Sequence, residues 1–233
     1  MPEKHISSQF DAELNSISTH VLEMGGLVES QLHQAVYALV HMSQESADQV
    51  LENEAKINKM EVLIDQEIIS TIGRRQPTAR DLRFLMAISR TTQNLERAGD
   101  EVARIARMVK SIADSGSPRN LPSSELRVAA DMASALLRKS LDSFARLDTA
   151  MAVTIIREDD HIDHEYNGFI RKLITYMMED PRTISASLDL MFLAKSIERV
   201  GDHAKNIAEQ IIFIVKGEDV RHTSMENVES VVR

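Results

Sequence analysis

The feature that most constrains this chain is a six-residue motif that occurs twice. Residues Leu95–Asp100 read LERAGD, and residues Ile197–Asp202 read IERVGD, 102 positions later. The apolar residues that follow keep the same separation, so that Ile105 matches Ile207. Matching apolar positions at one fixed separation indicate an internal duplication. We therefore expect two copies of one structural unit.

Each copy of the motif combines two features that are unfavourable in an isolated helix. An acidic residue stands four positions before another, as in Glu96 and Asp100 or Glu198 and Asp202, and a glycine lies between them. Like charges at this spacing cost about 0.2–0.5 kcal/mol, and a glycine inside a helix costs about 1 kcal/mol. Because both costs occur twice, we expect a compensating interaction. Our candidate is a bound cation.

The composition favours a helical protein. Of the 233 residues 43% are hydrophobic but only 4% are aromatic, and there are just 8 glycines and 5 prolines, which argues against an all-β fold. The net charge of −9, without any basic tract longer than a pair, argues against nucleic acid as a partner. The lack of cysteine fits a reducing compartment and leaves oxygen and imidazole as metal ligands. The N-terminus opens no secretory apolar segment, so we expect a cytoplasmic protein.

Apolar residues recur at spacings of three and four in six long segments, which predicts six helices. These cover residues 8–42, 47–73, 79–114, 124–144, 149–179 and 183–216. The predicted caps are Ser46, Thr78 and Asp148 at helix starts and Gly116 and Gly217 at helix ends.

The predicted fold class is all-α, a tandem repeat of two antiparallel three-helix bundles. The first bundle takes residues 1–116 and the second takes residues 117–217, on either side of a loop rich in serine and proline. Residues 218–233 form a polar C-terminal tail without an apolar stripe, and we expect this tail to be loosely held.

The helix before each motif carries an acidic pair with the same spacing of four. The pairs are Glu61 with Asp65 and Asp159 with Asp163. The second copy holds four more residues between its two pairs than the first copy does. Since four residues make about one helical turn, both copies can still bring their pairs face to face. One carboxylate of each pair falls on an apolar stripe.

Four carboxylates that converge on a half-buried site must bind protons, pair with arginine or coordinate cations. An all-oxygen set suits Mg, Mn, Fe or Zn. The alternative is that the acids are solvated, with Arg97 and Arg199 offsetting Asp100 and Asp202. The repetition of the pairs on two helices in each half favours metal.

Three histidines lie close to the second-half pairs in sequence. They have no histidine counterparts in the first copy, so we expect them at the surface and not among the ligands. They are His161, His164 and His203.

The two Glu-Arg-x-Gly-Asp copies, the acidic pairs and the stretch Pro77–Arg83 (PTARDLR) resemble the PhoU family of accessory regulators of bacterial phosphate-specific transport. The resemblance covers about residues 10–216. It implies tandem three-helix bundles that bind multinuclear metal clusters through Glu/Asp-x-x-x-Asp pairs. The metal ligands that it implies are Glu61, Asp65, Glu96 and Asp100 in the first half and Asp159, Asp163, Glu198 and Asp202 in the second.

Two features of the second copy depart from the family pattern. Asp159 stands where glutamate is usual, and its shorter side chain puts the nuclearity or affinity of the second site in doubt. Residues Pro181–Ile184 keep little of the Pro77–Arg83 stretch.

The resemblance also implies a function that no spacing argument supplies. It implies a non-enzymatic regulator that represses the phosphate-starvation (Pho) response when phosphate is plentiful. Such a regulator links the ATPase subunit of a phosphate ABC transporter to a membrane sensor histidine kinase, and it often forms a homodimer. The expected cofactors are divalent or trivalent metal ions.

Two other functions compete with this hypothesis. A di-iron enzyme of the carboxylate-bridged bundle type needs Glu-x-x-His in two helices. Only Glu158 with His161 has that spacing, and the first-half equivalents are Met60 and Leu63. The other alternative is a purely structural bundle whose acids are solvated or paired with arginine.

Overall fold

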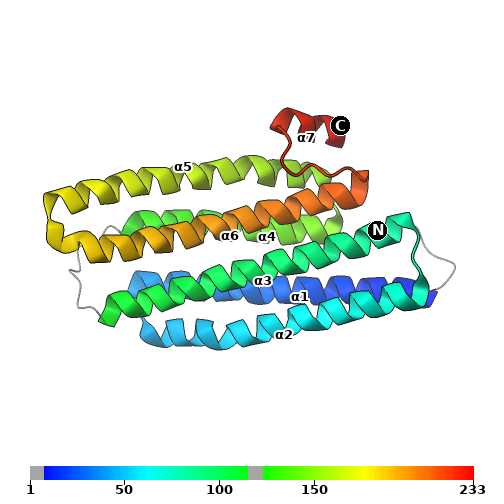
Figure 1. Ribbon diagram of the computed structural model, residues 1–233, viewed down its shortest axis with the longest axis horizontal. Helices are drawn as coiled ribbons and strands as arrows, with labels where there is room; N and C mark the ends of the chain where they lie inside the picture. Colours follow the sequence, from blue (N-terminus) through cyan, green and yellow to red (C-terminus); the bar gives the residue numbers. More distant parts are fainter. Residues whose placement is uncertain (1–7, 115–122) are drawn as a thin grey trace.

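The computed structural model describes residues 8–114 and 123–233, and within these residues it contains helices and no strands (Figure 1). The elements are α1 (Ser8–His41), α2 (Gln44–Arg75), α3 (Ala79–Asp114), α4 (Ser123–Arg146), α5 (Thr149–Glu179), the 3₁₀ turn η1 (Pro181–Thr183), α6 (Ile184–Lys216) and α7 (Met225–Val232). The six long helices confirm the all-α prediction. The expected helix end at Gly116 and the boundary between residues 116 and 117 lie outside the described residues.

The observed caps agree with the sequence at two ends and differ at a third. The Asp148 side chain accepts the backbone N–H of Met151 at 3.0 Å, and Gly217, with φ 81°, ends α6 in the left-handed conformation. The prediction that Ser46 caps the second helix was wrong. Ser43 is the cap, and its hydroxyl accepts the Ser46 N–H at 3.2 Å. Both serines are good caps, but only Ser43 has the extended backbone that a cap requires.

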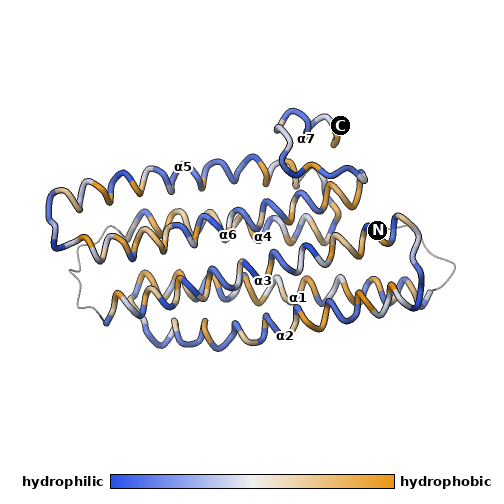
Figure 2. Tube along the Cα trace, viewed as in Figure 1, coloured by the Kyte–Doolittle hydropathy of each residue, from blue (hydrophilic) through white to orange (hydrophobic). Residues whose placement is uncertain are grey.

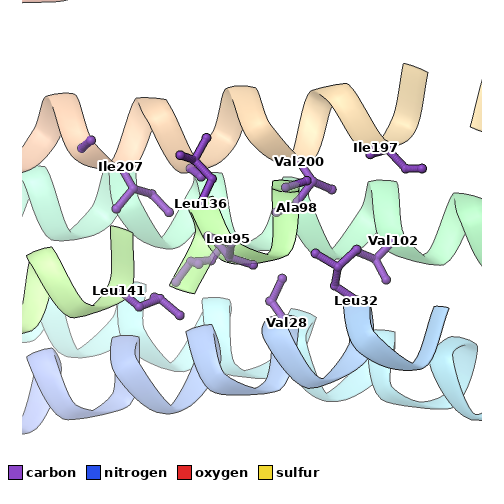
Figure 3. Close-up of a cluster of buried hydrophobic side chains, with 14 of the residues drawn as sticks. Val28, Leu32, Leu95, Ala98, Val102, Leu136, Leu141, Ile197, Val200 and Ile207 are labelled. Atoms are coloured by element: carbon purple, nitrogen blue, oxygen red, sulfur yellow. The ribbon is translucent and has the colours of Figure 1, made fainter. Parts of the chain in front are cut away.

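The two bundles share one core. Helices α1, α2 and α3 pack on one another, and so do α4, α5 and α6. Across the halves, α3 packs against α6 more extensively than any other pair of described helices, and α1 also packs against α4. Hydrophilic and hydrophobic residues alternate along the long helices (Figure 2). Figure 3 shows Val28, Leu95, Leu136 and Val200, from these four helices, within one apolar cluster.

A glycine allows α1 to approach the second half closely. Helix α1 continues without a break through Gly25 and Gly26. A Cβ at Gly25 would lie 2.3 Å from Leu141 Cδ2 of α4, whereas a Cβ at Gly26 would meet nothing within 4 Å. Gly25 is therefore a packing position, and Gly26 is not.

The C-terminal tail is held more firmly than the sequence predicts. Val220 and Val228 are each only 3% exposed, and Arg157 of α5 forms an ion pair with Glu229 of α7. A helix of eight residues can be anchored by a single buried apolar side chain, here Val228. One such residue makes no periodic pattern, so the sequence does not reveal the anchor. In the part of the chain that the structure describes, no helix is both long enough and apolar enough to cross a membrane.

Candidate metal centres

The glycines of the duplicated motif bring the acid-bearing helices together. A Cβ at Gly99 would lie 3.3 Å from Ile57 Cδ1 of α2, and one at Gly201 would lie 2.9 Å from Ile162 Cδ1 of α5. A larger residue at either position would therefore force the facing isoleucine side chain to shift. Close packing therefore offsets the cost of each interior glycine, independently of any cation.

The first-half quartet consists of Glu61 and Asp65 on α2 and Glu96 and Asp100 on α3. All four residues are half-buried. Burial raises the pKa of Glu61, and the Asp65 and Asp100 carboxylates raise it further. Burial also raises the pKa of Glu96, with added repulsion from Asp100 and Glu61. The Ser89 hydroxyl donates to Asp65 Oδ1 at 3.1 Å. Burial and mutual repulsion therefore disfavour the charged forms of Glu61 and Glu96, and the Arg97 guanidinium opposes this only in part.

The second-half quartet is more deeply buried. Asp159 of α5 is 1% exposed and Glu198 of α6 is 8% exposed, while Asp163 and Asp202 are half-buried. Burial raises the pKa of Asp159, and the Asp202 and Asp163 charges add to the rise. Burial likewise raises the pKa of Asp202, with repulsion from Glu198 and Asp163. All eight predicted residues therefore form two quartets, one in each half.

Two lysines distinguish the second quartet, and neither was predicted from the sequence. Lys205 Nζ donates to Asp159 Oδ2 at 2.9 Å, and Lys195 Nζ donates to Glu198 Oε1 at 2.5 Å. At the separation of 102 residues, the first-half counterpart of Lys195 is Gln93 and that of Lys205 is Ala103. A position-by-position comparison of the two copies would have revealed this difference in charge.

One oxygen of the second quartet remains unsatisfied. Glu198 Oε2 is buried and has no hydrogen-bond donor among the described residues. Burial raises the pKa of Glu198, Lys195 opposes the rise, and the Asp163 carboxylate adds to it. A buried acceptor without a donor is costly, and a cation would satisfy it.

The donor chemistry of both quartets fits a hard or borderline cation. Each offers carboxylate oxygens only, in a half-buried setting where the acids repel one another. Within the described residues, no three histidine or acidic side chains already stand together as ligands of a single ion. Binding would therefore require the carboxylates to turn toward the ion. Buried like charges favour that movement because a cation relieves their repulsion.

Arg199, the arginine of the second motif copy, has another role than the solvated-acid alternative assumes. Arg199 Nη1 donates to Glu101 Oε1 at 3.0 Å across the contact between α6 and α3, and Arg104 donates to the same carboxylate at 2.8 Å. Glu101 is only 6% exposed. Arg199 thus forms its hydrogen bond with Glu101 of the other half, so it does not serve chiefly to offset Asp202.

The histidine predictions were correct for two residues and wrong for the third. His161 and His164 are exposed, as expected. His203 is half-buried between α3 and α6, where its Nδ1 lies 3.1 Å from Asn94 Oδ1. Burial lowers the pKa of His203 to about 4, so its imidazole is neutral at pH 7. It contacts an amide of the first half and no carboxylate of either quartet.

A groove of about 770 Å³ is lined by residues of α3, α5, α6 and the C-terminal tail, and these include one aspartate of each quartet. The tail covers one side of it through residues 220–228. The charged residues that line this groove include Arg97, Asp100, Arg199, Asp202, Lys205 and Glu209. Asp100 and Asp202 belong to different quartets, so one carboxylate of each candidate metal centre lines the same groove.

Comparison with known proteins gives full-length matches. The PhoU domain matches residues 21–109 and 126–211. A phosphate-specific transport system accessory protein PhoU homolog from Burkholderia sp is 48% identical over 229 residues, which cover 98% of this chain and 97% of that protein. The corresponding Escherichia coli (strain K12) protein, phosphate-specific transport system accessory protein PhoU, is 44% identical over 98% of this chain and 94% of its own.

A solved structure gives the same result in three dimensions. The crystal structure of PhoU from Pseudomonas aeruginosa has a TM-score of 0.87 to this chain at 42% sequence identity. The match covers 90% of this chain and 100% of that one. The likeness therefore spans both bundles and the contact between them.

Proposed function

Because this chain belongs to the PhoU family, we propose that it is an accessory protein of a phosphate-specific transport system. The observation that carries the proposal is the match over 98% of the chain to relatives that bear this name. Both bundles of the family are matched, so this chain has the same two parts with which its relatives can contact a partner.

In the finer form of the proposal, the protein represses the phosphate-starvation response when phosphate is plentiful. It acts in the cytoplasm as a homodimer, by contact with the ATPase subunit of the transporter and with a membrane sensor histidine kinase. Six long helices and a net charge of −9 provide an extended acidic surface. Complementary charge on a partner sets the rate and the orientation of binding more than its strength.

The proposal includes metal ions bound at the two carboxylate quartets. The ions are Mg, Mn, Fe or Zn, since these accept oxygen ligands. What supports the proposal is the raised pKa of Glu61, Glu96, Asp159, Glu198 and Asp202, each caused first by burial and then by neighbouring carboxylates. A cation would stabilise the bundle by relieving this repulsion, and it would fix the shape of the groove.

We propose that the protein acts by binding its partner proteins and not by catalysing a reaction. The di-iron alternative would use Glu158 and His161, the one Glu-x-x-His in the sequence. Glu158 instead accepts both of its hydrogen bonds from Lys139 Nζ, at 2.8 and 2.6 Å, and His161 is exposed. Neither side chain contributes to the second quartet, which leaves that alternative without its histidine ligand.

A deletion strain tests the regulatory role. Without this protein, we expect phosphate-starvation genes to be transcribed even in phosphate-rich medium, as measured by a reporter fusion. Normal phosphate-dependent expression in the deletion strain, with no association with transporter or kinase in a pull-down, would refute the role. The association should also weaken as salt is raised, because exposed charges are screened beyond about 8–10 Å at physiological ionic strength.

A double substitution tests the metal role. Asp100→Asn together with Asp202→Asn removes one charge from each quartet and keeps side-chain size. We expect the purified variant to lose most of its bound metal, measured by plasma mass spectrometry, with unchanged helical circular dichroism. Retention of the full metal content would show that these aspartates are not principal ligands.

A further inference from the structure

We propose that the two quartets are not equivalent, and that Lys195 and Lys205 are the residues that weaken cation binding at the second one. The inference rests on the proposed metal role and adds an order of filling. The first quartet takes a divalent cation first, and the second takes one only at a concentration at least tenfold higher.

The two lysines already act as counter-cations of the second quartet. The Lys205 ammonium contacts Asp159 Oδ2 at 2.9 Å, and the Lys195 ammonium contacts Glu198 Oε1 at 2.5 Å. The carboxylates are 2% and 10% exposed at their side chains, whereas the lysines are 31% and 40% exposed. Each lysine therefore enters from the surface and ends on a buried acid. A buried pair of this kind resists separation because the acid left behind would be uncompensated.

The first quartet has no such counter-cation. Among the described residues, the only basic group that lowers the pKa of Glu61 and Glu96 is the Arg97 guanidinium. Its sequence counterpart Arg199 donates instead to Glu101 of the other half at 3.0 Å, so the two arginines serve different carboxylates. The second quartet has two ammonium groups, each hydrogen-bonded to a buried carboxylate, that the first quartet lacks, because Gln93 and Ala103 stand at the equivalent positions of the first half.

A cation that enters the second quartet must displace the ammonium groups or bind beside them. Displacement removes charge-assisted hydrogen bonds, which are among the stronger polar interactions in proteins. Binding beside them places the cation against two like charges within a poorly solvated site. The lysines already occupy Asp159 Oδ2 and Glu198 Oε1, which leaves Glu198 Oε2 as the buried oxygen of the second quartet that has no donor. Each route lowers affinity relative to the first quartet.

Titration of the metal-free full chain with Mn²⁺ tests the inference. Isothermal calorimetry and the electron paramagnetic resonance signal of free Mn²⁺ should resolve two classes of site, with dissociation constants at least tenfold apart. Asp100→Asn should remove the tighter class and Asp202→Asn the weaker one. Two sites of equal affinity, one at each quartet, would overturn the inference and leave the proposed metal role intact. No binding of Mn, Mg, Fe or Zn at either quartet would overturn both.

Lysine variants identify the cause of the difference. Replacement of Lys195 and Lys205 together by methionine should bring the weaker site to within about threefold of the tighter one. The matched control is Lys139→Met, which removes the partner of Glu158 outside the quartet and should leave both sites unchanged. An unaltered second site in the folded double variant would overturn the inference.

A reciprocal variant keeps the test decisive if the double variant does not fold. Gln93 is exposed and stands three residues before Glu96, the same spacing as Lys195 before Glu198. Gln93→Lys should weaken the tighter site at least fivefold without loss of helical circular dichroism. A tighter site with unchanged affinity in Gln93→Lys would contradict the role assigned to the lysines.

Discussion

Replacement of Glu209 by glutamine should stabilise the protein at neutral and alkaline pH but not at acidic pH. Glu209 is half-buried on α6 and lines the groove between the quartets. Burial raises the pKa of its carboxyl from 4.5 to about 7, although Lys205 and Arg221 oppose the rise. The charged form is therefore unfavourable in the folded protein, and glutamine avoids it.

The magnitude follows from the pKa. A rise from 4.5 to about 7 corresponds to about 3.4 kcal/mol, at about 1.36 kcal/mol per pH unit. Since Glu209 is only half-buried, solvent screens part of this, and we expect about 1.5 kcal/mol. Between pH 4.5 and 7 the folded state binds more protons than the unfolded state, so the stability of the parent falls as pH rises through this interval. Below pH 4.5 both states are protonated, and the advantage of the variant disappears.

Urea unfolding followed by circular dichroism, from pH 4.5 to 8.5, measures the effect. The difference in unfolding free energy between Glu209→Gln and the parent should grow from near zero to its full value above pH 7. Glu218→Gln is the matched control, because Glu218 is exposed in the tail. A difference that is independent of pH, or a variant less stable than the parent at pH 8, would refute the reasoning.

Three glycine substitutions test the packing, each by urea unfolding. Gly25→Ala should destabilise the protein by about 1–3 kcal/mol, since its Cβ would lie 2.3 Å from Leu141 Cδ2, and an unaffected stability would contradict the close approach of α1 and α4. Gly26→Ala, in open space on the same helix, should stabilise it by about 0.5–1 kcal/mol, and destabilisation would mean that this position is not free. Gly217→Ala should cost about 1–2 kcal/mol because of its φ of 81°, and a neutral result would show that α6 ends differently.

The sequence by itself determined the local structure and the duplication. Helices form where apolar residues recur with the helical period, and that signal lies within each segment. The caps at Asp148 and Gly217 depend on neighbouring residues only and were predicted correctly, whereas at the start of α2 two serines three residues apart both suit a cap and the wrong one was predicted. The acidic pairs could be recognised for the same reason, because a spacing of four places both carboxylates on one helix face.

Only the tertiary structure decided how the helices combine and which charges meet. Lys205 reaches Asp159 on a different helix, 46 residues away in sequence, and Arg199 reaches Glu101 in the other half. No local pattern encodes such contacts, since they depend on the packing of α5 on α6 and of α6 on α3. The same packing joins two repeated bundles into one core, because the apolar faces of α3 and α6 cover each other. The physical reason is that periodicity fixes which face of a helix is buried, whereas the identity of its neighbour depends on the whole arrangement.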